Sequence, residues 1–177
     1  MSGPLYQADS RWGSIVLGDG PSTIGKSGCL LVCLVEAARY LGTRPDMLPP
    51  HLNEACRQRG CFFGASLVVR DAAPLVGLVS PDAEKVTSNL ADQVVGMLGG
   101  GLAVLHVDHD DDPQGDHFLL AVKVAQREGM PPHVECYDPA TGVPVWLSLP
   151  DLEATARWGK VVKRYRTLSA RPIRKAA

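Results

Sequence analysis

Apolar and polar residues are arranged differently in the two halves of this chain. From Cys29 to Leu41, apolar side chains fall almost all round the first turns and polar ones appear only near the end. This pattern predicts a largely buried helix, with Ser27 as its N-cap and Gly42 as the glycine that ends it. Further helices are predicted, in chain order, at 47–59, 68–75 and 89–98.

Short apolar runs bounded by turn residues dominate the second half. Runs of this length predict strands, and a proline and a glycine between two of them predict a hairpin. A sequence of helices followed by antiparallel strands indicates an α+β domain. The predicted strands are 102–107, 117–124, 134–137, 143–149 and 161–168, with a short helix at 151–157.

The composition is typical of one globular domain. The chain has 177 residues, of which 45% are hydrophobic, and this is enough for a single core. We expect one domain over 1–177, with a catalytic core at about 6–168 and a basic, frayed C-terminal tail at 169–177. The formal net charge of −1 provides no field that would attract nucleic acid or an anionic membrane, so neither is an expected partner.

The N-terminal residues predict where the protein is made. Residues 1–10 contain neither a basic n-region nor an apolar h-region, so no signal peptide is predicted. No apolar run reaches the roughly 18 residues of a membrane span. We therefore expect synthesis in the cytoplasm, with delivery outside the cell or in a phage particle as the alternative.

The cysteines and histidines define the candidate chemistry. Five cysteines, irregularly spaced and without a secretion signal, indicate free thiols rather than a disulfide framework. No pair of Cys-x2-Cys knuckles exists and the histidines lack ligand spacing, so neither a metal nor another cofactor is predicted. The acidic loop 108–112 has alternating carboxylates but lacks the glycine and distal glutamate of a calcium loop. It is expected to be a solvated loop.

Cys29 is the cysteine best placed to be a nucleophile. Ser27 and Gly28 lead into the predicted helix, so the Cys29 thiol would lie at the positive end of the helix dipole, which favours the thiolate. Gly28 would also let the backbone approach a substrate closely. The alternative is an ordinary buried cysteine, and Cys33, one turn further on, is interpreted that way.

His117 and Asp138 are its predicted partners. His117 opens one predicted strand and Asp138 follows the end of the next. In an antiparallel hairpin these positions adjoin, which gives the arrangement of a general base and its orienting carboxylate. The alternatives are a surface-loop histidine and an ordinary turn aspartate. His106 and His109 are the competing candidates for the base.

Two sets of residues resemble a known family. Tyr6–Trp12 and Thr23–Cys29 resemble the opening of bacterial and phage domains similar to the bacteriocin-processing (double-glycine leader) cysteine peptidases. The family pattern ends with a His-Phe strand and an Asp-Pro-x-x-Gly turn, which His117-Phe118 and Asp138–Gly142 match. The resemblance spans roughly residues 6–150 and is specific at both ends.

The resemblance implies a papain-like fold and a set of catalytic roles. In this fold the N-terminal helices, including the nucleophile helix, pack on a C-terminal antiparallel sheet. Carried over by position, Cys29 is the nucleophile, His117 the base and Asp138 the third member. Gln7 is the side-chain donor of the oxyanion hole, with a bond to the loop backbone as its structural alternative. Trp12 is expected in the core or in a cleft wall.

The expected function is that of a thiol hydrolase that cleaves an amide bond through an acyl-enzyme intermediate. Its substrate would be a peptide, a protein or a peptidoglycan peptide. The alternatives are a catalytically silent papain-like binding module, and an acyltransferase or deamidase that uses the same triad. Leader removal coupled to export is not expected, because the chain has none of the transporter segments to which the processing peptidases are usually fused.

Overall fold

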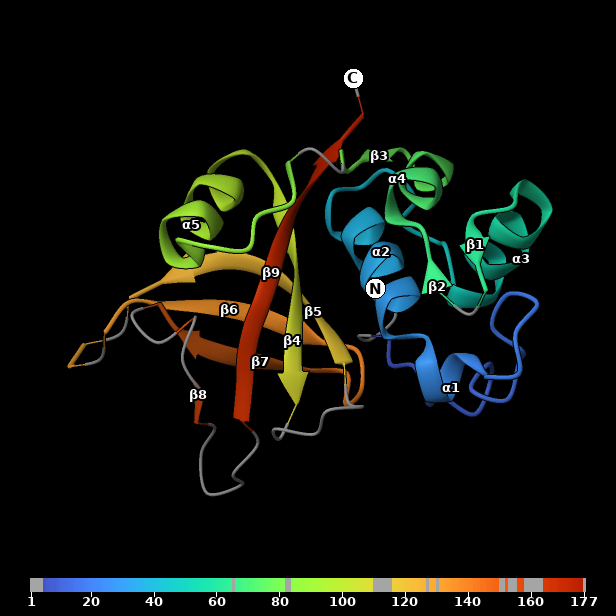
Figure 1. The fold of residues 1–177 in the computed structure, drawn as a ribbon, viewed down its shortest axis with the longest axis horizontal. Coiled ribbons are helices and arrows are strands. Elements are labelled where there is room, and N and C mark those ends of the chain that lie inside the picture. Colours follow the sequence, from blue (N-terminus) through green and yellow to red (C-terminus); the bar gives the residue numbers. More distant parts are fainter. Residues whose placement is uncertain are drawn as a thin grey trace. The chain divides into compact units, whose positions relative to one another are not determined.

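The computed structural model describes residues 5–64, 66–81, 84–109, 116–126, 128–129, 131–149, 152, 156–157 and 164–176. The chain divides into two compact units. Unit 1 contains Met1–Ser80, Pro139–Gly142 and Arg174–Ala177, and unit 2 contains Pro81–Asp138 and Val143–Ile173. Most helices lie in unit 1, and the strands of the main sheet pair in antiparallel fashion, so the architecture is α+β, as predicted (Figure 1).

Unit 1 is built mainly from helices. The helices expected at 29–41 and 47–59 are confirmed, with ends that differ by at most two residues, and the helix expected at 68–75 is a four-residue α-helix followed by a 3-10 helix. Another four-residue helix precedes these elements, and a small hairpin follows the helix Pro49–Arg59. The elements are α1 (Ile24–Ser27), α2 (Cys29–Tyr40), α3 (Pro49–Arg59), β1 (Phe62–Phe63), β2 (Ser66–Leu67), α4 (Val69–Ala72), the 3-10 helix η1 (Ala73–Val76) and β3 (Leu78–Val79).

Helix α2 is buried on almost every side, as the sequence predicted. Eight of its 12 residues are buried. Each buried leucine contributes about 1.5–3 kcal/mol relative to an exposed one. The predicted N-cap is wrong: Ser27 ends α1, its Oγ lies 2.7 Å from Ser22 Oγ, and Gly28 takes the cap position. Because α1 ends at Ser27 and α2 begins at Cys29, Gly28 is the single residue between the two helices and occupies the cap position. Gly42, with φ +71°, follows the helix as predicted.

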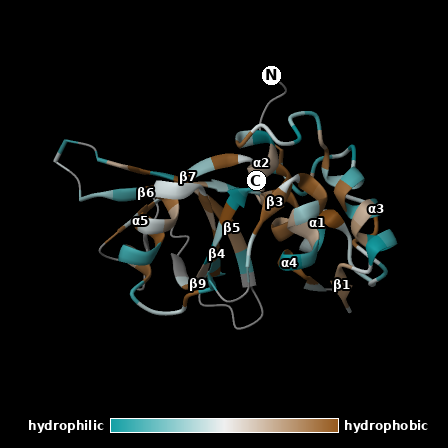
Figure 2. Ribbon diagram, turned by 90° about the horizontal axis from the view of Figure 1, so that it is seen from above, coloured by the Kyte–Doolittle hydropathy of each residue, from teal (hydrophilic) through white to brown (hydrophobic). Residues whose placement is uncertain are grey.

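Helix α3 is amphipathic. Leu52 and Cys56 are buried, whereas charged residues cover its outer side, and Figure 2 shows both hydrophobic and hydrophilic stretches on it. The helix begins at two prolines, which suit a first turn because their missing N–H would have no intrahelical acceptor. It ends at Gly60, whose φ of 67° lies in the left-handed region.

Unit 2 is an antiparallel sheet with one helix on it. The sheet order is β9-β4-β5-β6-β7, β8 pairs with β9, and the last residues of β9 pair with β3 in unit 1. Four of the predicted strands are confirmed, each within two residues of its predicted ends: 102–107, 117–124, 134–137 and 143–149. The elements are α5 (Leu90–Gly100), β4 (Leu102–His109), β5 (Asp116–Ala125), β6 (His133–Asp138), β7 (Val143–Ser148), β8 (Ala156–Arg157) and β9 (Arg164–Lys175).

The core of unit 2 lies between α5 and one face of the sheet (Figure 1). Leu90, Val94 and Met97 recur at helical spacing on α5 and are buried. Every second residue of β4 faces the same core, because side chains alternate between the two faces of a strand. The strand residues of this core include Ala103, Leu105, Val107, Leu119, Ala121, Val134, Cys136, Val145 and Leu147.

The C-terminal segment departs from the prediction. The strand expected at 161–168 is present from Arg164 on, but it does not end there. Strand β9 continues to Lys175, where a frayed tail was expected at 169–177, and pairs with β4 and β3. Basic residues suggested a solvated tail, but Ala170 and Ile173, which lie among them, are buried. Most of the expected helix at 151–157 lies outside the described residues, and its last two positions form β8 instead.

Candidate active site

His117 and Asp138 are hydrogen-bonded to one another in unit 2. His117 Nε2 lies 2.8 Å from Asp138 Oδ1. His117 is the second residue of β5 and Asp138 is the last of β6, and the register of these strands, with Leu120 opposite Tyr137, brings the two ends together. The prediction that these two residues are neighbours is confirmed, although 21 positions separate them.

The pair is shielded from water. Only 11% of the His117 side chain and 2% of the Asp138 side chain are exposed. A hydrogen bond is stronger in such surroundings, and a buried carboxylate needs a partner. An ionised Asp138 can only accept, so the proton of neutral His117 lies on Nε2 and the basic lone pair lies on Nδ1. The pair therefore presents an imidazole prepared to take a proton through Nδ1.

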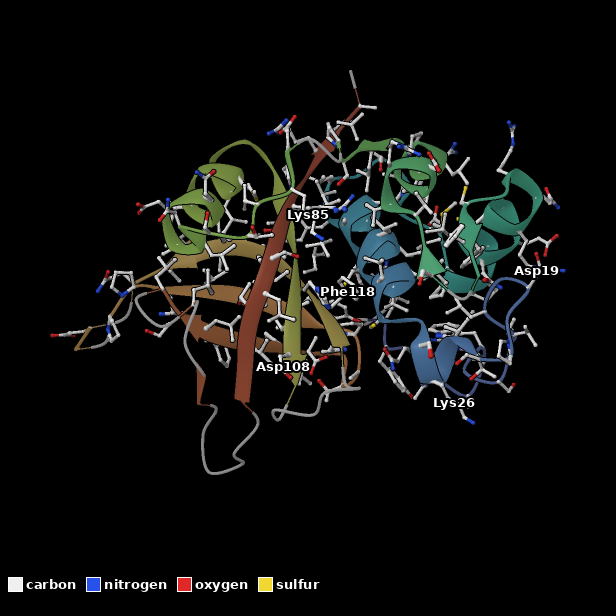
Figure 3. The ribbon with its side chains drawn as sticks, viewed as in Figure 1. Asp19, Lys26, Lys85, Asp108 and Phe118 are labelled. Atoms are coloured by element: carbon white, nitrogen blue, oxygen red, sulfur yellow. The ribbon has the colours of Figure 1, made fainter. Side chains whose placement is uncertain are left out.

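The two competing histidines are placed differently. Val107 is the register partner of His117, whereas His106 is opposite Phe118, so His106 and His117 project from opposite faces of the sheet. The His106 ring stacks on Phe118, with ring centroids 4.8 Å apart and an interplanar angle of 16°. Phe118 is labelled on its strand in Figure 3. His109 is the last residue of β4. The sheet geometry therefore separates His106 from the His117–Asp138 pair.

Cys29 is the first residue of α2 in unit 1. The residue is buried, with 7% of its surface exposed. As the first helical residue, its N–H has no intrahelical acceptor, and its thiol lies at the positive end of the helix dipole. The Gly28 N–H donates to the Ile24 carbonyl at 2.8 Å, and a Cβ at Gly28 would overlap that carbonyl oxygen. Gly28 is thus required by the tight junction of α1 and α2, which sets where α2 begins.

The other cysteines are less suited to act as nucleophiles. None of the five forms a disulfide, and all are buried. Burial raises the pKa of the Cys136 thiol well above its ordinary value, and the neighbouring carboxylates of Glu135 and Asp138 add to this. Burial also raises the pKa of the Cys56 thiol, and the neighbouring Cys61 raises it further. Cys33 is fully buried one turn inside α2. At neutral pH the Cys56 and Cys136 thiols therefore stay protonated.

Gln7 is held in the N-terminal segment of unit 1. Its Nε2 donates to the Gly25 carbonyl at 3.1 Å, and its backbone N–H donates to the Pro139 carbonyl at 2.7 Å. The bond to Gly25 is the kind of backbone contact that the structural alternative for Gln7 predicted, although Gly25 lies in α1 rather than in a loop. A side-chain amide has two N–H groups, so this bond leaves a second hydrogen for another acceptor. Trp12 is in the core, as one alternative had it, and its Nε1 donates to the Tyr6 carbonyl at 2.9 Å.

The turn after Asp138 is part of unit 1. Gly142 has a φ of +73°, and a Cβ there would lie 3.2 Å from Tyr6 Cβ. Together with the bond from Gln7 to Pro139, this contact ties the Asp-Pro-x-x-Gly turn to the N-terminal segment. Sequence reasoning missed Gly25 and Pro139 as backbone partners of Gln7. Only the match of both segments to one family pattern could have suggested that they meet.

The four predicted site residues fall into two groups. Gln7 and Cys29 belong to unit 1, and His117 and Asp138 belong to unit 2. The structure joins the second group directly.

Metal ligands do not gather in the described part of the chain: no three His, Cys, Asp or Glu side chains there form a group that could hold a metal ion. Of the acidic loop, Asp108 lies near the end of β4 (labelled in Figure 3), and residues 110–112 lie outside the described ranges. The pairing of Asp108 with Asp116 places the start of that loop at the end of the β4–β5 hairpin.

Comparison with known proteins adds no family assignment. No protein-family model matches the chain, and no curated protein matches its sequence. Among the described residues, no helix combines the length and the apolar character needed to cross a membrane. The likeness to the leader peptidases thus depends on the sequence features alone.

Proposed function

We propose that the protein is a papain-like thiol hydrolase, in which the nucleophile helix α2 packs on the sheet of unit 2. The observation that carries the proposal is the buried hydrogen bond between His117 Nε2 and Asp138 Oδ1. A histidine oriented by a carboxylate is the base that thiol and hydroxyl nucleophiles require. The position of Cys29 at the start of α2 supplies the matching nucleophile.

The first half of the reaction forms an acyl-enzyme. His117 Nδ1 takes the thiol proton, and the Cys29 sulfur attacks the carbonyl carbon of an amide. The negative charge moves to the carbonyl oxygen, where the Cys29 N–H and the second Gln7 N–H would donate hydrogen bonds. The tetrahedral intermediate then collapses: the C–N bond breaks, the imidazolium gives its proton to the leaving amine, and a thioester remains on Cys29.

The second half restores the enzyme. The amine departs and water takes its place. His117 Nδ1 now removes a proton from water, which attacks the thioester carbon, and the C–S bond breaks to release the carboxylic acid. Asp138 keeps the Nε2 proton in place and stabilises the imidazolium formed in each half. No cofactor is needed in this scheme.

The substrate class follows from the resemblance and stays part of the proposal. Peptides, proteins and peptidoglycan peptides all supply amide bonds of the required kind. The same triad would also support acyl transfer or glutamine deamidation, and a silent binding module would retain the fold alone. These functions differ in product: a new amino terminus, a new cross-link, released ammonia, or none.

The first test is the reactivity of the Cys29 thiol. The rate of iodoacetamide alkylation of each cysteine is measured against pH by peptide mass spectrometry. An activated Cys29 reacts quickly near pH 6, well below the ordinary thiol pKa of about 8.5. His117→Ala should slow this reaction strongly, whereas His106→Ala, on the opposite face of the sheet, should leave it unchanged.

Product analysis completes the test. The protein is incubated with a mixture of unmodified peptides, and new amino termini, cross-links and ammonia are quantified. New termini that depend on Cys29 support the hydrolase. If Cys29 alkylates no faster than an ordinary thiol and no product forms, the triad is not assembled and the binding-module alternative takes its place.

A further inference from the structure

The end of α3 brings two cysteines together. The Cys61 N–H donates to the Cys56 carbonyl at 2.9 Å, and the Gly60 N–H donates to the Arg57 carbonyl at 3.3 Å. These two bonds around a left-handed glycine define a Schellman motif. In this motif the side chain after the glycine frequently packs against the helix residue that accepts its bond or the one before it. The motif therefore brings the Cys61 and Cys56 side chains to neighbouring positions.

The two thiols form an isolated pair inside unit 1. Cys56 is fully buried and Cys61 is 1% exposed. Burial raises the pKa of the Cys56 thiol, and the neighbouring Cys61 raises it further. Both thiols are free. The proposed mechanism uses neither of them.

This pair lies where two supports of the N-terminal loop meet. From α3, Asn53 Oδ1 accepts the Gly18 N–H at 2.9 Å, and Asn53 Nδ2 donates to the Val16 carbonyl at 2.9 Å. From β1, the Phe62 ring lies against Gly18, where a Cβ would come within 2.8 Å of the ring. Figure 1 shows the β1–β2 hairpin beside α3. Cys56 belongs to the first support and Cys61 directly precedes the second.

A surface contact strengthens the same connection. Arg57 Nε donates to Asp19 Oδ1 at 2.9 Å, and Asp19 is labelled in the loop near α3 in Figure 3. Both groups are largely exposed, so this ion pair contributes little to stability. The buried hydrogen bond from Gly18 to Asn53 and the contact of the half-buried Phe62 ring with Gly18 carry most of the support for residues 16–18.

We propose that Cys56 and Cys61 are a redox-active dithiol whose disulfide clamps the two supports of the Val16–Gly18 loop. The oxidant is a low-molecular-weight disulfide, such as oxidised glutathione. The Cys61 thiolate attacks one sulfur of the oxidant and releases one thiol. The Cys56 sulfur then attacks the mixed disulfide, releases the second thiol and closes the ring. Two protein thiols are oxidised and one disulfide is reduced to two thiols.

The test uses the full chain with Cys29→Ala, so that its result does not depend on the proposed hydrolase. The protein is incubated with oxidised glutathione, the remaining thiols are blocked with N-ethylmaleimide, and the products are digested with trypsin. Arg57 and Arg59 lie between the two cysteines, so trypsin separates them. We expect most of the protein to lose two hydrogen atoms, about 2 Da. The digest should contain a linked pair of peptides with Cys56 in one and Cys61 in the other.

A second readout tests the clamp itself. Hydrogen exchange of the amides of residues 16–20 should slow several-fold in the oxidised protein and return to its first rate after reduction with dithiothreitol. Cys61→Ala and Cys56→Ala should each abolish both changes. Cys136→Ala, a buried thiol in unit 2, should leave both intact and serves as the matched control.

Three results would overturn the proposal. The two thiols stay reduced in the folded protein, a glutathione adduct persists on one of them, or the disulfide forms without slowing exchange at residues 16–20. The pairing result for the protein with Cys56 and Cys61 intact stands even where the Cys56→Ala or Cys61→Ala variant fails to fold.

Discussion

In unit 2, His117 and Asp138 are placed by the register of two neighbouring strands, whereas in unit 1 Cys29 and Gln7 are placed by turns and a helix junction. Strand register is difficult to change, because a shift by one residue would turn every side chain to the other face. The junction at Gly28 and the bonds of Gln7 each depend on a few individual contacts. Unit 2 therefore carries the more robust half of the proposed site, and unit 1 carries the half that small changes can disturb.

This contrast is testable by asking whether the two groups act as one. The largest expected effect is that of Cys29→Ala, which should lower turnover by at least about 10⁴-fold because the nucleophile is lost. The melting temperature should change little. Cys33→Ala, one turn along the same helix, is the matched control and should keep turnover while it loses some stability. Wild-type rates in the Cys29 variant would remove unit 1 from the mechanism.

The next largest effect concerns the base in unit 2. His117→Ala should lower turnover by about 10³-fold, because general-base catalysis and thiol activation are both lost. His106→Ala removes the ring that stacks on Phe118 and should leave most of the activity. Steady-state hydrolysis of a peptide found in the product screen measures both. Equal losses in the two variants would show that the wrong histidine has been assigned.

Gln7 offers a way to separate a catalytic from a structural role. Gln7→Ala should lower kcat by about 10²-fold if its amide stabilises the oxyanion. Iodoacetamide alkylation of Cys29 creates no oxyanion, so its rate should stay near that of the wild type. If both rates fall together, the bond of Gln7 to Gly25 only holds the N-terminal segment and the oxyanion role is wrong.

Asp138 provides a finer comparison. In Asp138→Asn the amide oxygen can still accept the Nε2–H, so the tautomer is kept and only the charge that stabilises the imidazolium is lost. We expect Asp138→Asn to keep more activity than Asp138→Ala, because only the alanine variant has no acceptor for the Nε2–H. Rates measured across pH provide the check. Equal losses in the two variants would mean that the hydrogen bond of 2.8 Å has no orienting role.

The smallest effect is a pH dependence of stability in unit 1. Burial raises the pKa of the Glu36 carboxyl above 4.5, although the Leu5 N–H and Arg39 oppose this. The folded state then binds the proton more tightly than the unfolded chain does. This contribution to stability is full below 4.5 and is lost as pH rises through the raised pKa.

Glu36→Gln should remove this dependence. The free energy of unfolding of the variant, relative to the wild type, should rise with pH through this window, by less than about 1 kcal/mol. Urea unfolding at a series of pH values measures it.

Local patterns predicted most of the elements. The buried helix from Cys29 and the strands that carry His117 and Asp138 follow clear patterns of apolar residues. That His117 and Asp138 are neighbours followed from the antiparallel pairing of their two strands. The N-cap of α2 was wrong because four residues before it form a helix that no periodic pattern marks. The C-terminal strand was predicted to end too early, because its basic residues suggested a solvated tail and gave no sign that Ala170 and Ile173 are buried.

The sequence by itself determined the α+β order, the start of α2 at Cys29 and the adjacency of His117 to Asp138, because each depends on residues close in the chain or on one hairpin. Tertiary structure decided what depends on distant partners. It paired β9 with β4 and bound Gln7 to Gly25 and Pro139. It also placed the Ile24 carbonyl so close to Gly28 that a side chain does not fit there. Contacts between segments far apart in sequence leave no periodic trace, so only the folded chain reveals them.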